Sequence, residues 1–157
     1  MITFSSHADV AAQVGQHLGY SGYVDVTQER VNQFAEATGD HQWIHVDVER
    51  AKDGPFGGTI AHGYLTLALG PALLHDVIEW KNIRMGVNYG LGKVRFPSPV
   101  PVGARVRLGA SLDAVEEVAG PAGTTGVQVT LVTTYEVEGA TKPACVAELL
   151  LRYFFEE

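Results

Sequence analysis

A chain of 157 residues, 46% of them hydrophobic, can bury a core and is too apolar to be disordered, so we expect residues 1–157 to form a single domain. The formal net charge of −7 provides no basic stripe, which argues against a protein that binds nucleic acid. The single cysteine, Cys145, excludes an internal disulfide and suits a reducing compartment, which we take to be the cytoplasm.

The N-terminal part of the chain is expected to hold a short helix and a short strand. Val10, Val14 and Leu18 recur at helical spacing after a pair of serines that can cap a helix. This pattern predicts a helix over residues 5–18, and residues 23–26 then have the composition of a strand. We expect no secretory signal, because no basic segment precedes an apolar run, and no stretch is long enough to span a membrane.

A second helix is predicted to begin after Thr27 and to end at Gly39. Threonine is a good N-cap residue, and glycine is the usual residue where a helix stops in the left-handed conformation. The apolar stripe of this helix consists of Val31, Phe34 and Ala35. One further turn of helix is expected over residues 48–52, before a loop rich in turn residues at 53–58.

The longest apolar segment predicts a buried helix over residues 60–77. The segment is apolar on nearly every side, and a helix with so little polar surface must be covered by other elements. Pro71 lies inside it, so we expect a kink or a loosened turn at that point.

From residue 83 onward the pattern changes to alternating strands joined by tight turns. Strands are predicted over residues 87–96, 104–118, 127–137 and 142–155. One apolar helix followed by long antiparallel strands indicates an α+β domain in which the sheet wraps the helix, the hot-dog fold. Such a sheet keeps an open edge that another subunit usually pairs with, so we predict a homodimer.

The chemistry is predicted to centre on residues 37–45, where one carboxylate and one imidazole lie five residues apart. On a continuous helix, Asp40 and His45 would point about 140° apart, so they converge only if the helix ends near Gly39 and they lie on an irregular loop. General acid–base catalysis needs two such groups fixed near one substrate atom. A structural interpretation stays open, in which Asp40 is a cap and His45 is a half-buried loop residue.

A second feature of interest is the dipeptide His62-Gly63 at the start of the predicted buried helix. The first N–H groups of a helix have no partner inside the helix, and a glycine lets a ligand approach the backbone closely. Gly63 is therefore a candidate for stabilising a developing oxyanion. The alternative is that Gly63 only permits tight packing against a strand.

Three ordered blocks of sequence carry a resemblance to a known family. They are Gly39-Asp40-x3-Ile44-His45-x5-Ala51, Thr59-Ile60-Ala61-His62-Gly63-Tyr64, and Lys93-Val94-Arg95-Phe96-Pro97 with Pro99-Val100-x2-Gly103. Together they cover residues 27 to about 110 and resemble the MaoC-like (R)-specific enoyl-CoA hydratases, called hydratase 2, in their NodN-type branch. Gln42-Trp43 stands where the family usually has Asn-Pro, which bears on the loop path and on acyl-chain preference more than on the chemistry.

The resemblance implies a hot-dog fold and reversible syn addition of water to a trans-2-enoyl-CoA in fatty acid metabolism, giving an (R)-3-hydroxyacyl-CoA. It implies that Asp40 takes a proton from the attacking water. His45 would orient that water and help deliver a proton to C2, while the Gly63 N–H would bind the thioester oxygen. The implied partner is an acyl-CoA thioester, with no metal and no other cofactor.

Further substrate contacts are expected from His62, Tyr64, Asn88 and Arg95. Tyr64 can wall the acyl chain, Asn88 can line its pocket, and Arg95 can meet the CoA phosphates. Each has a structural alternative: His62 as a packing residue at the helix start, Tyr64 in the core, Asn88 at a β-bulge and Arg95 as a solvated charge on a strand.

Three other functions compete with hydration. A zinc site could use His41 and His45, four residues apart, with Asp40 and His62, although the glutamate of the H-E-x-x-H motif is absent. A hot-dog thioesterase shares the fold and the acyl-CoA substrate but usually lacks the Asp-x4-His pair. A non-catalytic subunit that binds acyl groups or a partner would have no need to keep both Asp40 and His45.

Overall fold

The computed structural model describes residues 1–156, and its largest element is a six-stranded antiparallel sheet. Its order is β2 (His17–Tyr20), β6 (Arg105–Ala119), β7 (Thr125–Val137), β8 (Cys145–Phe155) and β5 (Ile83–Arg95), and β3 (Val24–Asp25) also pairs with β6. A separate parallel pair is formed by β1 (Ile2–Phe4) and β4 (Ile78–Trp80). The 3-10 turn η1 (Pro121–Gly123) connects β6 to β7.

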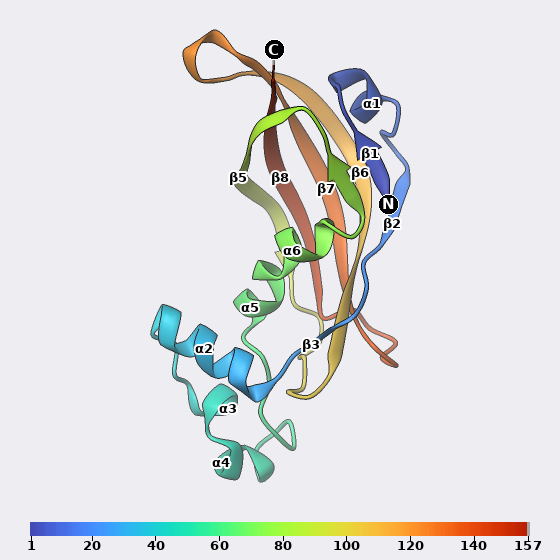
Figure 1. Cartoon of the computed structure of the whole chain (residues 1–157). Helices are drawn as coiled ribbons and strands as arrows, with labels where there is room; N and C mark the ends of the chain where they lie inside the picture. Colours follow the sequence, from blue (N-terminus) through green and yellow to red (C-terminus); the bar gives the residue numbers. More distant parts are fainter. Residues whose placement is uncertain (157) are drawn as a thin grey trace.

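The helices take two positions relative to the sheet (Figure 1). One group lies against a face of the sheet and consists of α5 (Gly63–Ala68) and α6 (Gly70–Leu74). The other lies near one end of the sheet, next to the start of α5, and consists of α2 (Gln28–Thr38), α3 (Trp43–Val46) and α4 (Val48–Lys52). The short helix α1 (His7–Ala11) packs near β1. Within residues 1–156 the structure has no helix long and apolar enough to cross a bilayer.

The core lies between the α5–α6 segment and the sheet, and strand alternation explains it. Val106, Leu108, Ala110 and Leu112 follow every second position of β6 and are at most 1% exposed. They belong to one buried cluster with residues of the helical segment, among them Leu65, Leu73 and Leu74. A sheet that packs around one central helical segment confirms the predicted α+β class and the hot-dog arrangement.

The predicted helix over residues 5–18 is wrong in its length. The helix is only α1, and its cap is Ser6, whose hydroxyl accepts a hydrogen bond from the Asp9 N–H at 3.3 Å. The chain turns through Gly15 at a φ of +82°, and His17–Tyr20 then pair with β6. Pairing with a neighbouring strand satisfies these backbone groups, so tertiary structure overrides the helical spacing of the sequence.

The predicted helix over residues 60–77 is also shorter than expected. Residues 60–62 are extended, because the Ile60 N–H donates to the carbonyl of Ile44 and the Ala61 N–H donates to that of Val100. The helix begins at Gly63, and α5 and α6 meet at Leu69, two residues before the proline. The loosened turn predicted near Pro71 is thus confirmed.

Within residues 1–156, strand β5 lies at the end of the sheet and pairs only with β8, which leaves its other edge free. It carries exposed apolar side chains, namely Met85 at 40%, Val87 at 39%, Tyr89 at 55% and Leu91 at 49%. The helical segment beside it also presents exposed residues, including Tyr64 at 73%. The chain does not cover this side by itself, contrary to the expectation of a helix buried all round.

Candidate active site

The Asp40 carboxylate is placed by the end of α2. Thr27 caps the start of this helix, with its hydroxyl accepting from the Arg30 N–H at 3.1 Å. Gly39 ends it in the left-handed conformation, with a φ of 78° and its N–H donating to the carbonyl of Ala35 at 2.8 Å. Both ends of α2 are therefore as the sequence predicts. Asp40 follows on an exposed turn, and its carboxylate accepts from the Gln42 N–H at 3.4 Å.

His45 lies on α3, a single turn of helix rather than the irregular loop that the sequence suggested. The ring is buried, and its Nδ1 lies 2.7 Å from the carbonyl oxygen of Ile60. A carbonyl oxygen only accepts, so Nδ1 must carry the hydrogen, and in the neutral ring Nε2 keeps its lone pair. The contact with Ile60 thus fixes both the tautomer and the direction of the ring.

Gln28 holds α3 in place, and no sequence motif pointed to it. Its side-chain nitrogen donates to the carbonyl of His45 at 2.8 Å, and its side-chain oxygen accepts from the Thr59 hydroxyl at 2.6 Å. One glutamine on the first turn of α2 therefore ties together the two segments that surround His45. Nothing in its local sequence distinguishes it from a surface residue of a helix.

His62 completes a cluster with Asp40 and His45. Its Nε2 lies 2.9 Å from the backbone oxygen of Asp40, and its ring stacks on the His45 ring with centroids 3.9 Å apart. One ligand-type atom from each of the three residues lies within 4.8 Å of the others. The five-residue spacing of Asp40 and His45 therefore does bring the two groups together.

The same cluster is the only group of potential metal ligands found among residues 1–156. One nitrogen of each imidazole already faces a carbonyl oxygen, so each ring has a single nitrogen left for a metal. His41, which lies four residues before His45 in the zinc-like spacing, is outside the cluster. Its Nε2 lies 3.5 Å from the Oε1 of Glu36. The absence of a metal stays a prediction.

Gly63 is the first residue of α5, so its N–H has no acceptor within that helix. It lines a cavity of about 300 Å³ together with His45. A methyl group at this position would lie 3.2 Å from the Phe96 ring, so any side chain here would press against Phe96. Gly63 and His45 therefore line the same cavity.

The other predicted contacts lie apart from this cluster. Tyr64 is 73% exposed and lies edge-on to Phe96 with ring centroids 6.3 Å apart. The Arg95 side chain donates to the adjacent carbonyl of Val94 at 2.8 Å. Asn88 lines a different cavity.

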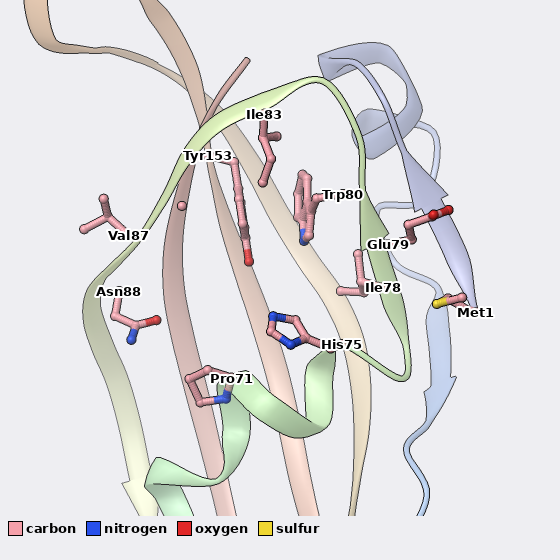
Figure 2. Close-up of a pocket in the computed structure, with 11 residues that line it drawn as sticks. Met1, Pro71, His75, Ile78, Glu79, Trp80, Ile83, Val87, Asn88 and Tyr153 are labelled. Atoms are coloured by element: carbon pink, nitrogen blue, oxygen red, sulfur yellow. The ribbon is translucent and has the colours of Figure 1, made fainter. Parts of the chain in front are cut away.

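The larger cavity, of about 610 Å³, lies beyond the end of α6 between that helix and β5 (Figure 2). Figure 2 shows Asn88 on one side and His75, Tyr153 and Trp80 across from it. Trp80 stacks on Tyr153 with ring centroids 3.6 Å apart. His45 lines the smaller cavity and not this one, so the size of this cavity does not make it the site of acid–base chemistry.

Comparison with known proteins shows which family the whole chain resembles. Residues 9–133 match the family described as "MaoC like domain". The chain is 59% identical over 153 residues to "3-hydroxyacyl-thioester dehydratase Z" of Mycobacterium tuberculosis, covering 98% of this chain and 99% of that protein. It is 44% identical over 144 residues to "Nodulation protein N" of Rhizobium leguminosarum bv. viciae, covering 90% and 87%.

A solved structure supports the fold. The MaoC-like dehydratase from Rhodospirillum rubrum superposes with a TM-score of 0.70 at 20% identity, covering 92% of this chain and 94% of that one. At this identity the likeness concerns the arrangement of helices and strands alone.

Proposed function

The chain belongs to the family of MaoC-like domains and is a hydro-lyase of the hydratase–dehydratase class. We propose that it catalyses the reversible (R)-specific hydration of trans-2-enoyl-CoA. The product is an (R)-3-hydroxyacyl-CoA of fatty acid metabolism. The observation that carries the proposal is the convergence of the Asp40 carboxylate with the imidazole of His45, within 4.8 Å. A relative that is 59% identical to this chain is named as a dehydratase, which supports the same class of reaction.

The fixed tautomer of His45 defines how the water would be held. With Nδ1–H directed at the Ile60 carbonyl, Nε2 can accept one hydrogen of a water molecule, and the Asp40 carboxylate can accept the other. Asp40 removes a proton as the water oxygen bonds to C3, and the C2–C3 double bond opens toward the thioester. The proton taken up by Asp40 then passes to C2 on the same face, which gives syn addition and returns Asp40 to its carboxylate form.

Gly63 is proposed to stabilise the charge that develops in this reaction. As C3 gains oxygen, negative charge moves to the thioester oxygen, and the free N–H of Gly63 is the donor that we assign to it. One such donor typically contributes roughly 2.7–4 kcal/mol of transition-state stabilisation. Water addition then requires no metal and no other cofactor.

The decisive experiment follows crotonyl-CoA by two signals, the absorbance of its conjugated double bond and the release of free thiol. We expect absorbance to fall without thiol release, and we expect (R)- but not (S)-3-hydroxybutyryl-CoA to be dehydrated in reverse. Asp40→Asn is the matched control, because it keeps the shape of the side chain without a general base. Thiol release would instead indicate a thioesterase, and binding without either signal would indicate a non-catalytic subunit.

The partners and the setting are proposals of the same kind. We propose that the chain acts as one domain, that its partner molecule is an acyl-CoA thioester, and that it forms a homodimer in the cytoplasm. The free edge of β5 and its exposed apolar side chains support the dimer. A buried, unpaired Cys145 supports a reducing compartment.

A further inference from the structure

The environment of His62 differs from that of its neighbours in the site. Its side chain is 2% exposed and lies between two rings, Phe34 at a centroid distance of 4.8 Å and His45 at 3.9 Å. Packed against both rings, His62 offers little surface to a substrate. We propose that His62 is a positioning residue, which holds the Asp40 backbone and the His45 ring in the arrangement that the reaction uses; this inference rests on the proposed function.

The first part of the argument is the hydrogen bond to Asp40. The backbone oxygen of Asp40 can only accept, so the Nε2 of His62, 2.9 Å away, carries the hydrogen. The Asp40 carboxylate has only a local contact, to the N–H of Gln42. Among the hydrogen bonds of residues 1–156, the one from His62 alone ties Asp40 to an element outside its own loop.

The second part is the unpaired nitrogen on the other side of the ring. Nδ1 of His62 is buried and has no hydrogen-bond partner within residues 1–156. Leaving a buried polar atom unpaired destabilises the folded state, a cost that an apolar residue of similar size would avoid. If His62 served only for packing, an apolar residue of similar size would make the fold more stable. What the histidine provides, and an apolar ring cannot, is the hydrogen bond from Nε2 to the Asp40 backbone oxygen.

The third part is the stack on His45. The two imidazole planes are inclined by 24°, so His62 forms a flat wall along one face of the His45 ring. The Ile60 carbonyl fixes the His45 ring at Nδ1, and the His62 wall limits its rotation about that bond. Displacing a catalytic group by about 1 Å can lower a rate about a hundredfold, so such constraints affect activity even in residues that never touch the substrate.

Two substitutions separate the hydrogen bond from packing. His62→Phe keeps an aromatic ring in the stack but removes the N–H that holds Asp40. His62→Gln removes the ring but places an amide N–H near the position of Nε2. We expect His62→Phe to lower kcat on crotonyl-CoA by about 10- to 100-fold with KM nearly unchanged, and His62→Gln, which loses only the stack on His45, to lower kcat several-fold less than His62→Phe does.

The experiment measures kcat, KM and the melting curve of both variants, together with amide hydrogen exchange of residues 39–43. Faster exchange there in His62→Phe than in His62→Gln is the expected result. A folded His62→Phe with the parent kcat and parent exchange would overturn the proposal, as would equal losses of kcat in both variants. If the parent protein fails to hydrate crotonyl-CoA, the proposed function fails, and the exchange comparison still decides whether His62 holds the Asp40 loop.

Discussion

The hydrogen bond between His45 and Ile60 allows catalysis and stability to be tested separately at one residue. The Nδ2 amide group of an asparagine lies near the position of the histidine Nδ1, so His45→Asn can still donate to the Ile60 carbonyl. It has no atom at the position of Nε2. We therefore expect His45→Asn to fold like the parent while kcat falls by about a hundredfold or more, with KM little changed.

His45→Ala removes both functions of the ring. The Ile60 carbonyl, which is buried beside the ring, then loses the donor that lies 2.7 Å away. An unpaired buried acceptor costs about 1–3 kcal/mol of unfolding free energy, which for a chain of this length is roughly 3–10 °C in melting temperature. His45→Ala should therefore lose both activity and stability, whereas His45→Asn should lose activity alone.

The assay is steady-state hydration of crotonyl-CoA beside a melting curve for the same preparation of each variant. A normal kcat in His45→Asn would remove His45 from the mechanism. A normal kcat with much weaker binding would make the residue a substrate contact instead. His45→Ala with the melting temperature of the parent would show that the Ile60 contact contributes no stability, and the argument from the fixed tautomer would fail with it.

Four further predictions concern other parts of the molecule. Asp40→Asn should lower kcat by at least about a hundredfold in a folded protein, and activity within about threefold of the parent would contradict the role of Asp40 as general base. Tyr135→Phe should lower the unfolding free energy by about 1–3 kcal/mol, because the Tyr135 hydroxyl donates to the Leu67 carbonyl at 3.1 Å. In a Pro71→Ala background the same variant should lose much less unfolding free energy. Equal losses would refute the coupling between Tyr135 and Pro71. Burial raises the pKa of Cys145 to about 11, so the native protein should not react with a thiol reagent at pH 8 until denaturant is added. Rapid reaction without denaturant would show that the thiol is accessible. Sedimentation at micromolar concentration should show a species of twice 16.9 kDa. Leu91→Glu on β5 should weaken the association of the two chains. If the parent protein sediments with the mass of one chain, the homodimer proposal is wrong.

The end of α2 and the four long strands could be predicted because short-range physics determines them. A threonine cap, an apolar stripe and a left-handed glycine lie within one stretch of chain, so Thr27 and Gly39 bound the helix in sequence and structure alike. Alternation along β6 places the same apolar side chains inward whatever the neighbouring strands are. The prediction that a helix end near Gly39 lets Asp40 and His45 converge belongs to this class.

The features that sequence could not give depend on contacts between distant residues. Leu18 continues the helical spacing of the predicted helix, but hydrogen bonds to β6, about 90 residues away along the chain, hold residues 17–20 as a strand. The Ala61 N–H donates to Val100, which delays the start of the buried helix until Gly63. Gln28 and His62 acquire their roles only when the segments after α2 fold against α5.

The buried helix shows both kinds of cause acting on the same residues. Pro71 has no N–H to offer the Leu67 carbonyl four residues earlier, so sequence alone predicts a weakened turn. The Tyr135 hydroxyl, from strand β7, donates to that carbonyl instead. A side chain on Gly70 would overlap this hydroxyl, so the glycine is what admits it. The Tyr135 hydroxyl thus ties the end of α5 to the sheet, and α5 is the helix that we propose presents Gly63 to the substrate.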